Sequence, residues 1–217
     1  LITALVGVVF SVVLVNVQGG LFLGLIRKAS LLVDHGRADI WVGHKEIHNV
    51  DFPRDIPRRW VHRVRAVPGV KRAEPYLIGF SEMTLPSGGF EGVAVVGCEP
   101  ATLLGSPWNV TPGHPGAILR NDGIIVDRSE ADKLEHPRVG EIREVGGCRV
   151  RVAGLSRGIT NFLITPYIFT TYDRAAAFLR KDPRLCSYLL VELEPDADPA
   201  ETCARIRQRV PEADAFP

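Results

Sequence analysis

The chain has 217 residues, of which 46% are hydrophobic and 24% charged, and its formal net charge is +1. With 21 glycines, 16 prolines and 4 cysteines, this composition excludes a collagen-like, a disordered and a disulfide-dense chain. All Lys, Arg, Asp and Glu residues follow Ile26, so an uncharged head precedes a charged body of about 190 residues, enough for one or two compact units. Without a basic excess or a charged tail, no nucleic-acid partner is expected.

The uncharged head, Leu1–Ile26, predicts a transmembrane helix. At 1.5 Å per residue it would extend about 39 Å, more than the roughly 30 Å of a bilayer's hydrocarbon core. The apolar region of a signal peptide is shorter, and no A-x-A cleavage pattern follows here. The first flanking charges are Arg27 and Lys28, and because the sequence does not begin with Met, we expect the natural chain to begin before Leu1.

Small and polar residues of this span gather on two opposite faces of the predicted helix. At 100° per residue, Thr3, Gly7, Ser11 and Gln18 lie on one face, within about 80° of one another. The opposite face carries Asn16 and the G-x-x-x-G pair Gly20 and Gly24. Small residues allow close helix approach in lipid, so we predict neighbouring spans on both sides, beyond the ends of this chain or on another subunit; a lone anchor is the alternative. The predicted helix-packing residues are Gly7, Ser11, Gln18, Gly20 and Gly24.

After the span, the pattern alternates between strands and helices. The helix is expected to continue to Val33 and to end at Asp34–Gly36, and Asp55 and Pro57 are expected to start a second helix whose apolar residues recur at helical spacing until Pro68. Strands are expected at 38–42, at 70–85 and, after the turn 86–89, at 90–97.

The middle of the chain predicts a small, mostly-β unit. A buried strand at Gly123–Asp127 precedes a short helix at Ser129–Leu134, and the Gly146-Gly147 pair is typical of a tight hairpin turn between the strands at 139–145 and 148–155. A strand at 167–171 and a helix at 174–180 follow, while 107–115 reads as an irregular loop that Trp108 fixes to the body.

The last segment repeats the plan of the first. An alternating strand at 188–194 leads to Asp198-Pro199-Ala200-Glu201, a capping box with proline at the first helical position, and the helix is expected to end at Val210-Pro211. Two strand–helix–strand units predict an α+β fold: a transmembrane helix followed by a ferredoxin-like split βαβ domain with an inserted mostly-β subdomain. The predicted units are 1–33 (helix and extension), 34–98 with 182–217 (βαβ), and 99–181 (insertion).

No pattern of residues predicts catalysis, a cofactor or a bound metal. His44 and His48, with His35 upstream, have the i, i+4 spacing of zinc ligands, but H-K-E-I-H is not H-E-x-x-H and Pro53 follows closely, so a solvated loop is favoured. The sequence contains no G-x-x-x-x-G-K-[ST], which argues against an ATPase on this chain.

The remaining acidic and thiol groups are given structural roles. Acidic residues around the strand–helix junction near Asp127 are expected to complement a helix dipole rather than to act as a catalytic pair. The four cysteines, which include Cys98 and Cys203 at core positions, lack a C-x-x-C pair and are expected to be structural thiols; in an oxidising compartment one or two disulfides stay open as an alternative, with three possible full pairings.

The order of these elements resembles the permease subunits of MacB/FtsX-type ABC transporters, with the DevC-like branch most similar. Each motif is weak alone, but their order and spacing are specific and cover nearly the whole chain as a first span plus a periplasmic core domain. The runs that carry the resemblance are VPGVKRAEPY (Val67–Tyr76), VVGCEP (Val95–Pro100), IIVDRSEADKL (Ile124–Leu134), VGEIREVGGCRVRVAGL (Val139–Leu155) and YLLVELEPDAD (Tyr188–Asp198).

The resemblance implies an extracytoplasmic domain between the first and second of four spans of a dimeric permease in the inner (plasma) membrane. It implies an ABC ATPase subunit, separate or fused, which drives export through motion of the external domain, and often a periplasmic adaptor protein. The later three spans are absent from these residues, so transport by this chain alone is not expected. An FtsX-like regulator of a cell-wall hydrolase and a lipoprotein-releasing permease are the alternatives.

Overall fold

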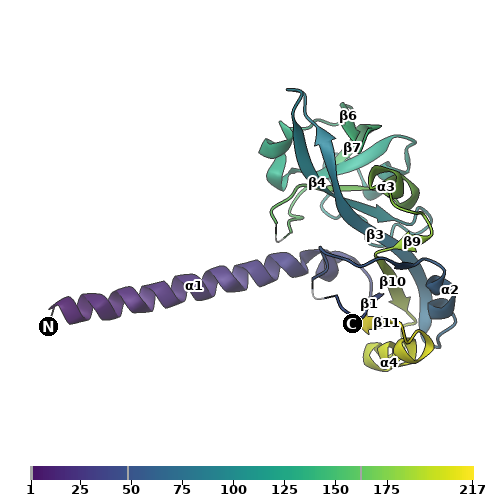
Figure 1. Ribbon diagram of the computed structural model, residues 1–217, viewed down its shortest axis with the longest axis horizontal. Helices are drawn as coiled ribbons and strands as arrows, with labels where there is room; N and C mark the ends of the chain where they lie inside the picture. The colour runs from purple at the N-terminus through teal and green to yellow at the C-terminus, as the bar shows by residue number, and fades with distance from the viewer. Residues whose placement is uncertain (1, 48, 162) are drawn as a thin grey trace.

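The structure, a computed structural model, describes residues 2–47, 49–161 and 163–217. Its first element is one unbroken helix, α1 (Ile2–His35), which extends away from the rest of the molecule (Figure 1). The helix ends where predicted, because Gly36 and the left-handed Arg37 (φ 54°) turn the chain away from the helical path. Among the described residues, one helix is long and apolar enough to cross a membrane, and it covers Leu5–His35 with a mean hydropathy of 2.1.

The first unit of the body has the predicted ferredoxin-like topology. Its four strands lie in the order β11-β1-β10-β3, and all neighbours are antiparallel. Buried residues of its two helices join one hydrophobic cluster, so both helices cover the same face of the sheet. The elements are β1 (Ile40–His44), α2 (Trp60–Arg65), β3 (Val70–Thr84), β10 (Tyr188–Leu193), α4 (Pro199–Arg209) and β11 (Ala213–Phe216).

The second unit is a closed sheet. Its strands follow the order β3-β4-β8-β5-β7-β6, and β6 pairs back onto β3 through Met83 and Val145, which closes the sheet and removes its free edges. The hairpin predicted at Gly146-Gly147 is present, with φ values of 58° and 83°. The elements are β4 (Phe90–Cys98), η1 (Pro115–Leu119), β5 (Gly123–Asp127), η2 (Arg128–Leu134), β6 (Ile142–Val145), β7 (Cys148–Ser156), β8 (Tyr167–Thr171) and α3 (Tyr172–Phe178).

Strand β3 connects the two units. Its first half, Val70–Tyr76, pairs with β10 of the first unit, and its second half, Leu77–Thr84, pairs with β4 of the barrel. Since β4 itself pairs with β3 and β8, the strand pairing runs across the predicted boundary after Cys98, and the division into units at 98/99 and 181/182 stays a prediction. Figure 1 shows α1 entering the body between the barrel and the first unit.

Two predicted helix starts differ from the structure. The helix expected from Asp55 or Pro57 begins only at Trp60, because Ile56 and Pro57 form a short strand (β2, Ile56–Pro57) against β9 (Leu185–Cys186). The helix expected at 174–180 begins at Tyr172, directly after the last residue of β8. In both cases a pairing with a distant segment, which the local pattern does not contain, sets where the helix starts.

Candidate functional site

The end of α1 is held firmly by the body. Leu32, only 2% exposed, packs in the same cluster as Trp41 of β1. Gly36 makes this approach possible, because a Cβ there would lie 2.9 Å from the Leu32 carbonyl oxygen and 3.2 Å from the Trp41 ring. The His35 ring stacks on Trp108 with 4.6 Å between centroids, so the predicted anchoring role of Trp108 is realised on the helix itself.

The loop 103–108 connects the end of α1 to strand β3 through hydrogen bonds. The Gly105 amide donates to the Gly36 carbonyl at 3.1 Å, and the Arg37 guanidinium donates to the Leu103 carbonyl and to Ser106 Oγ, both at 3.3 Å. On its other side the Gly105 carbonyl accepts a 2.9 Å hydrogen bond from the buried Tyr76 hydroxyl.

Tyr76 lies where β3 passes from one unit to the other, since its partner is Tyr188 of β10 whereas the next residue pairs with Gly97 of β4. Burial raises the pKa of the Tyr76 phenol well above its usual range, so the group stays a neutral donor. The end of α1, the loop and the middle of β3 therefore form one continuous set of contacts, which we name the α1 joint (residues 32–41, 103–108 and Tyr76).

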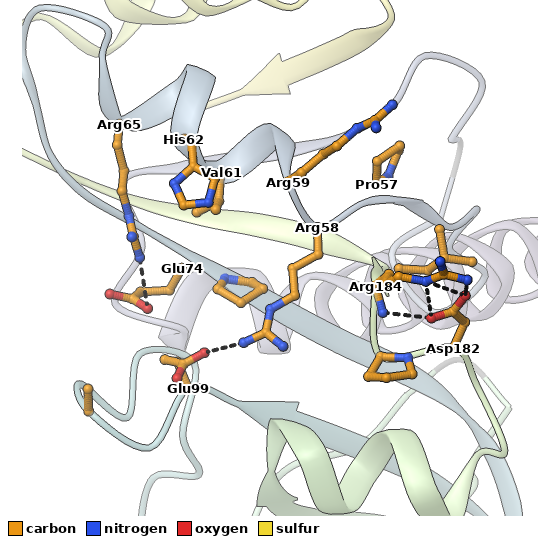
Figure 2. Close-up of a pocket in the computed structure, with 14 residues that line it drawn as sticks. Pro57, Arg58, Arg59, Val61, His62, Arg65, Glu74, Glu99, Asp182 and Arg184 are labelled. Atoms are coloured by element: carbon orange, nitrogen blue, oxygen red, sulfur yellow. Dashed lines mark hydrogen bonds and ion pairs between the residues drawn. The ribbon is translucent and has the colours of Figure 1, made fainter.

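A cleft of about 870 Å³ lies beside the joint, between α2 of the first unit and the segments 99–101 and 182–185. Figure 2 shows Arg58 reaching from the α2 side toward Glu99. The Arg58 guanidinium lies 3.3 Å from Glu99 Oε2 and 3.8 Å from Asp173 Oδ1, and its central carbon lies 4.3 Å from the centroid of the Tyr172 ring. Arg58 thus joins the first unit to the end of β4 and to α3 of the barrel, an arrangement that we name the Arg58 clamp.

The charged groups around the clamp are also paired. Arg65 contacts Glu74 at 3.6 Å, and burial raises the pKa of the Glu74 carboxyl while the Arg65 charge opposes that shift. The exposed Asp182 and Arg184 pair with each other, as Figure 2 also shows. These pairs make the cleft a polar contact between the two units of the body.

His35 and His44, two of the three histidines with a candidate metal spacing, contact other groups of the chain. His35 stacks on Trp108, the ring Nδ1 of His44 accepts from the Glu46 amide at 3.3 Å, and His48 lies outside the described residues. Within the described ranges 2–47, 49–161 and 163–217, no group of three His, Cys, Asp or Glu side chains could hold an ion.

Acidic and thiol groups take structural positions, as predicted. Asp127 caps the short helix η2 by accepting from the Ser129 amide, and its other oxygen accepts from Ser156 Oγ at 2.8 Å. All four cysteines are free thiols, and burial raises the pKa of Cys98 and Cys186 to about 12.

The predicted helix-packing residues lie along the exposed part of α1. Ser11 Oγ donates to the Gly7 carbonyl at 2.9 Å, and a Cβ at Gly20 or Gly24 would meet no atom of the described chain within 4 Å. The surface is therefore open to close approach by another helix, and its role in packing stays a prediction.

No sequence motif predicts the Arg58 clamp. Arg58, Glu99 and Tyr172 belong to three separate segments, and none of them stands in a recognisable motif. The irregular loop was expected and its Trp108 was singled out, but its contact with the end of α1 depends on the tertiary fold.

Comparison with known proteins agrees with this architecture. Solved structures with this fold include the extracellular domain of the noncanonic ABC-type transporter YknZ from Gram-positive bacteria, with a TM-score of 0.58 and 12% identity over 82% of this chain and 99% of that one. They also include the periplasmic region of MacB from Actinobacillus actinomycetemcomitans, with a TM-score of 0.57 and 9% identity over 82% of this chain and 86% of that one. No curated protein matches the sequence. The family model of the MacB-like periplasmic core domain matches residues 1–209, and the chain therefore belongs to this family of ABC transporter permeases.

Proposed function

We propose that this chain is the first span and external domain of a permease subunit that couples ATP hydrolysis on a partner subunit to export. The α1 joint supports this proposal: a helix that begins in the apolar run continues without a break to His35, and the loop 103–108 connects its end to Tyr76 in the middle of β3. A continuous α-helix is a stiff element, so displacement of its membrane part moves the joint, and through β3 both units of the body.

The permease is expected to act as a dimer in the inner membrane, together with an ABC ATPase and, for export, a periplasmic adaptor. The small residues on opposite faces of α1 support neighbouring helices on both sides. Leucine at Gly20 and Gly24 should therefore weaken association in the membrane, measured by cross-linking of the full permease, while the body folds normally. Leucine at Val8 and Val15, which are exposed and lie between the two predicted packing faces, is the matched control, and equal cross-linking of both variants would contradict the packing role.

The coupling is tested by inserting a flexible Gly-Ser segment after Arg27 in the full permease, with its ATPase and adaptor present. Because the insertion breaks the stiff path between span and joint, ATP hydrolysis should persist while export is lost. The same insertion after Ser87, in the exposed turn between β3 and β4, is the control and should leave export intact. Undiminished export with the insertion after Arg27 would refute mechanical coupling through α1.

The regulatory and lipoprotein-releasing alternatives predict a different pattern. A regulator of a cell-wall hydrolase would use the same stiff connection without exporting a substrate, so the insertion would abolish hydrolase activation in cells that show no adaptor-dependent export. No contact within the described chain favours either alternative over export.

A further inference from the structure

The connection between β7 and β8, of which the structure describes residues 157–161 and 163–166, presents apolar side chains to solvent. Leu163 is 46% exposed and the adjacent Ile164 is 44% exposed, and we name these two residues the tip of the loop. Adjacent exposed aliphatic side chains are unfavourable in water and are typical of surfaces that contact an apolar partner. Neither residue takes part in the α1 joint or the Arg58 clamp.

The loop is built as a rigid support for these side chains. The buried Asn161 side chain bridges the tip, since its Oδ1 accepts from the Thr165 amide at 2.9 Å and its Nδ2 donates to the Thr165 carbonyl at 3.3 Å. At the base, Ile159 is buried, and its amide donates to Asp127 Oδ2 at 3.2 Å. Lys133 of η2 donates to the Ile164 carbonyl.

The backbone at the tip is strained in a way that a structural turn would avoid. Ile164 has a φ of 54°, a left-handed conformation that costs a β-branched residue more than it costs Asn or Gly. A residue chosen for the turn alone would be Asn or Gly. An exposed isoleucine held there by the Asn161 bridge and Lys133 indicates a requirement for the side chain itself.

The loop extends from the barrel on the side from which α1 leaves the body (Figure 1). Because α1 is the predicted membrane span and its first charges are Arg27 and Lys28, this side of the body faces the bilayer.

We infer that the tip of this loop, Leu163 and Ile164, inserts into the membrane interface and so supports the barrel against the outer face of the bilayer. The groups around the tip suit such a position. Lys133, which donates to the Ile164 carbonyl, can reach lipid phosphates, and Glu130, 3.6 Å from the Lys133 ammonium, moderates the local charge. Insertion is therefore expected to depend on the apolar side chains more than on anionic lipid.

The test places an environment-sensitive NBD fluorophore on Leu163→Cys in the full chain, reconstituted in phosphatidylcholine nanodiscs that contain a lipid with a doxyl quencher near its headgroup. Cys148 is replaced by serine because it is the partly exposed native thiol, whereas the other three are buried. The same label at Ser87→Cys, on the exposed turn between β3 and β4, is the control. We expect a blue-shifted emission and at least about twofold quenching at position 163 and neither at position 87. Equal quenching at both positions would overturn the inference, and so would an unquenched, blue-shifted label at 163, since that result would mean that a protein surface covers the tip.

A second variant separates a membrane role from a structural one. Ile164→Asn accepts the left-handed conformation and keeps the Asn161 bridge, so its melting temperature should equal or exceed that of the parent. Quenching of the label at 163 should nevertheless fall toward that of the control. A lowered melting temperature with unchanged quenching would show that Ile164 serves the fold alone. Neither readout uses export or ATP hydrolysis, so the result is independent of the proposed coupling.

Discussion

Replacing Arg58 by alanine removes the side chain that joins the first unit to the barrel. The Arg58–Glu99 pair is partly shielded, with 34% and 24% of the two side chains exposed, so we assign it about 1 kcal/mol, near the upper end for surface pairs. The stacking on Tyr172 adds about 0.5–1 kcal/mol. Asp173, whose side chain is 81% exposed, is expected to add little. The variant should therefore lose about 1.5–2 kcal/mol of unfolding free energy.

A double-mutant cycle with Glu99→Gln isolates the pair. Each single variant and the double variant are unfolded in urea in detergent, and unfolding of the body is followed by tryptophan fluorescence. We expect a coupling energy of about 1 kcal/mol between positions 58 and 99. Arg58→Lys, which keeps the charge but loses the planar stacking surface, should lose about half as much stability as alanine. Strict additivity of the two single variants would refute the clamp as an energetic link between the units.

Three further predictions concern the packing and ionisation of the body. Gly105→Ala should lower the free energy of unfolding in urea by at least about 2 kcal/mol, because its Cβ would lie 2.4 Å from the Tyr76 ring. The control Gly88→Ala, with a similar positive φ and open space around it, should lower it by only about 1 kcal/mol. Equal losses would mean that the joint is loosely packed. At pH 8 an alkylating reagent should label Cys148 rapidly and Cys98 only after unfolding, as measured by mass spectrometry, because burial raises the pKa of the Cys98 thiol to about 12. The hydrogen bond from Lys71 and the Arg72 charge lower the pKa of Glu192. Glu192→Gln should therefore lose about 0.2–1 kcal/mol of unfolding free energy above the ordinary pKa near 4.5, and this loss should vanish as the pH falls through the lowered value. A stability difference between parent and variant that grew at low pH would reverse the assigned sign.

Much of the body could be predicted from local pattern. The local residue pattern located the strands at 123–127 and 167–171 to the residue, both of them buried throughout, and the Asp198 capping box and Pro199 fixed the start of α4, where the Asp198 side chain accepts from the Glu201 amide. The two strand–helix–strand repeats indicated the split βαβ topology because each repeat carries its own turns and caps. These features depend on interactions between residues close in sequence.

The closure of the barrel and the clamp could not be predicted in this way. Closure depends on the pairing of Met83 with Val145, and the clamp depends on Arg58 meeting Glu99 and Tyr172, all contacts between distant segments. The same reason explains the late start of α2, since the partner of Ile56 lies in β9. A pattern read within a window of residues contains no information on such pairs.

A distance measurement shows whether α1 and the body move as one stiff piece. Spin labels at Leu23→Cys on the exposed part of α1 and at Glu82→Cys on the barrel part of β3, in a Cys148→Ser background, report the separation of span and body by pulsed electron resonance in a full transporter in which only one permease subunit carries the labels. If the connection is stiff, we expect one narrow distance distribution, unchanged between the nucleotide-free and ATP-bound states, and a broad one after the Gly-Ser insertion at Arg27. A broad distribution without the insertion, or a mean distance that shifts with ATP, would contradict a stiff connection.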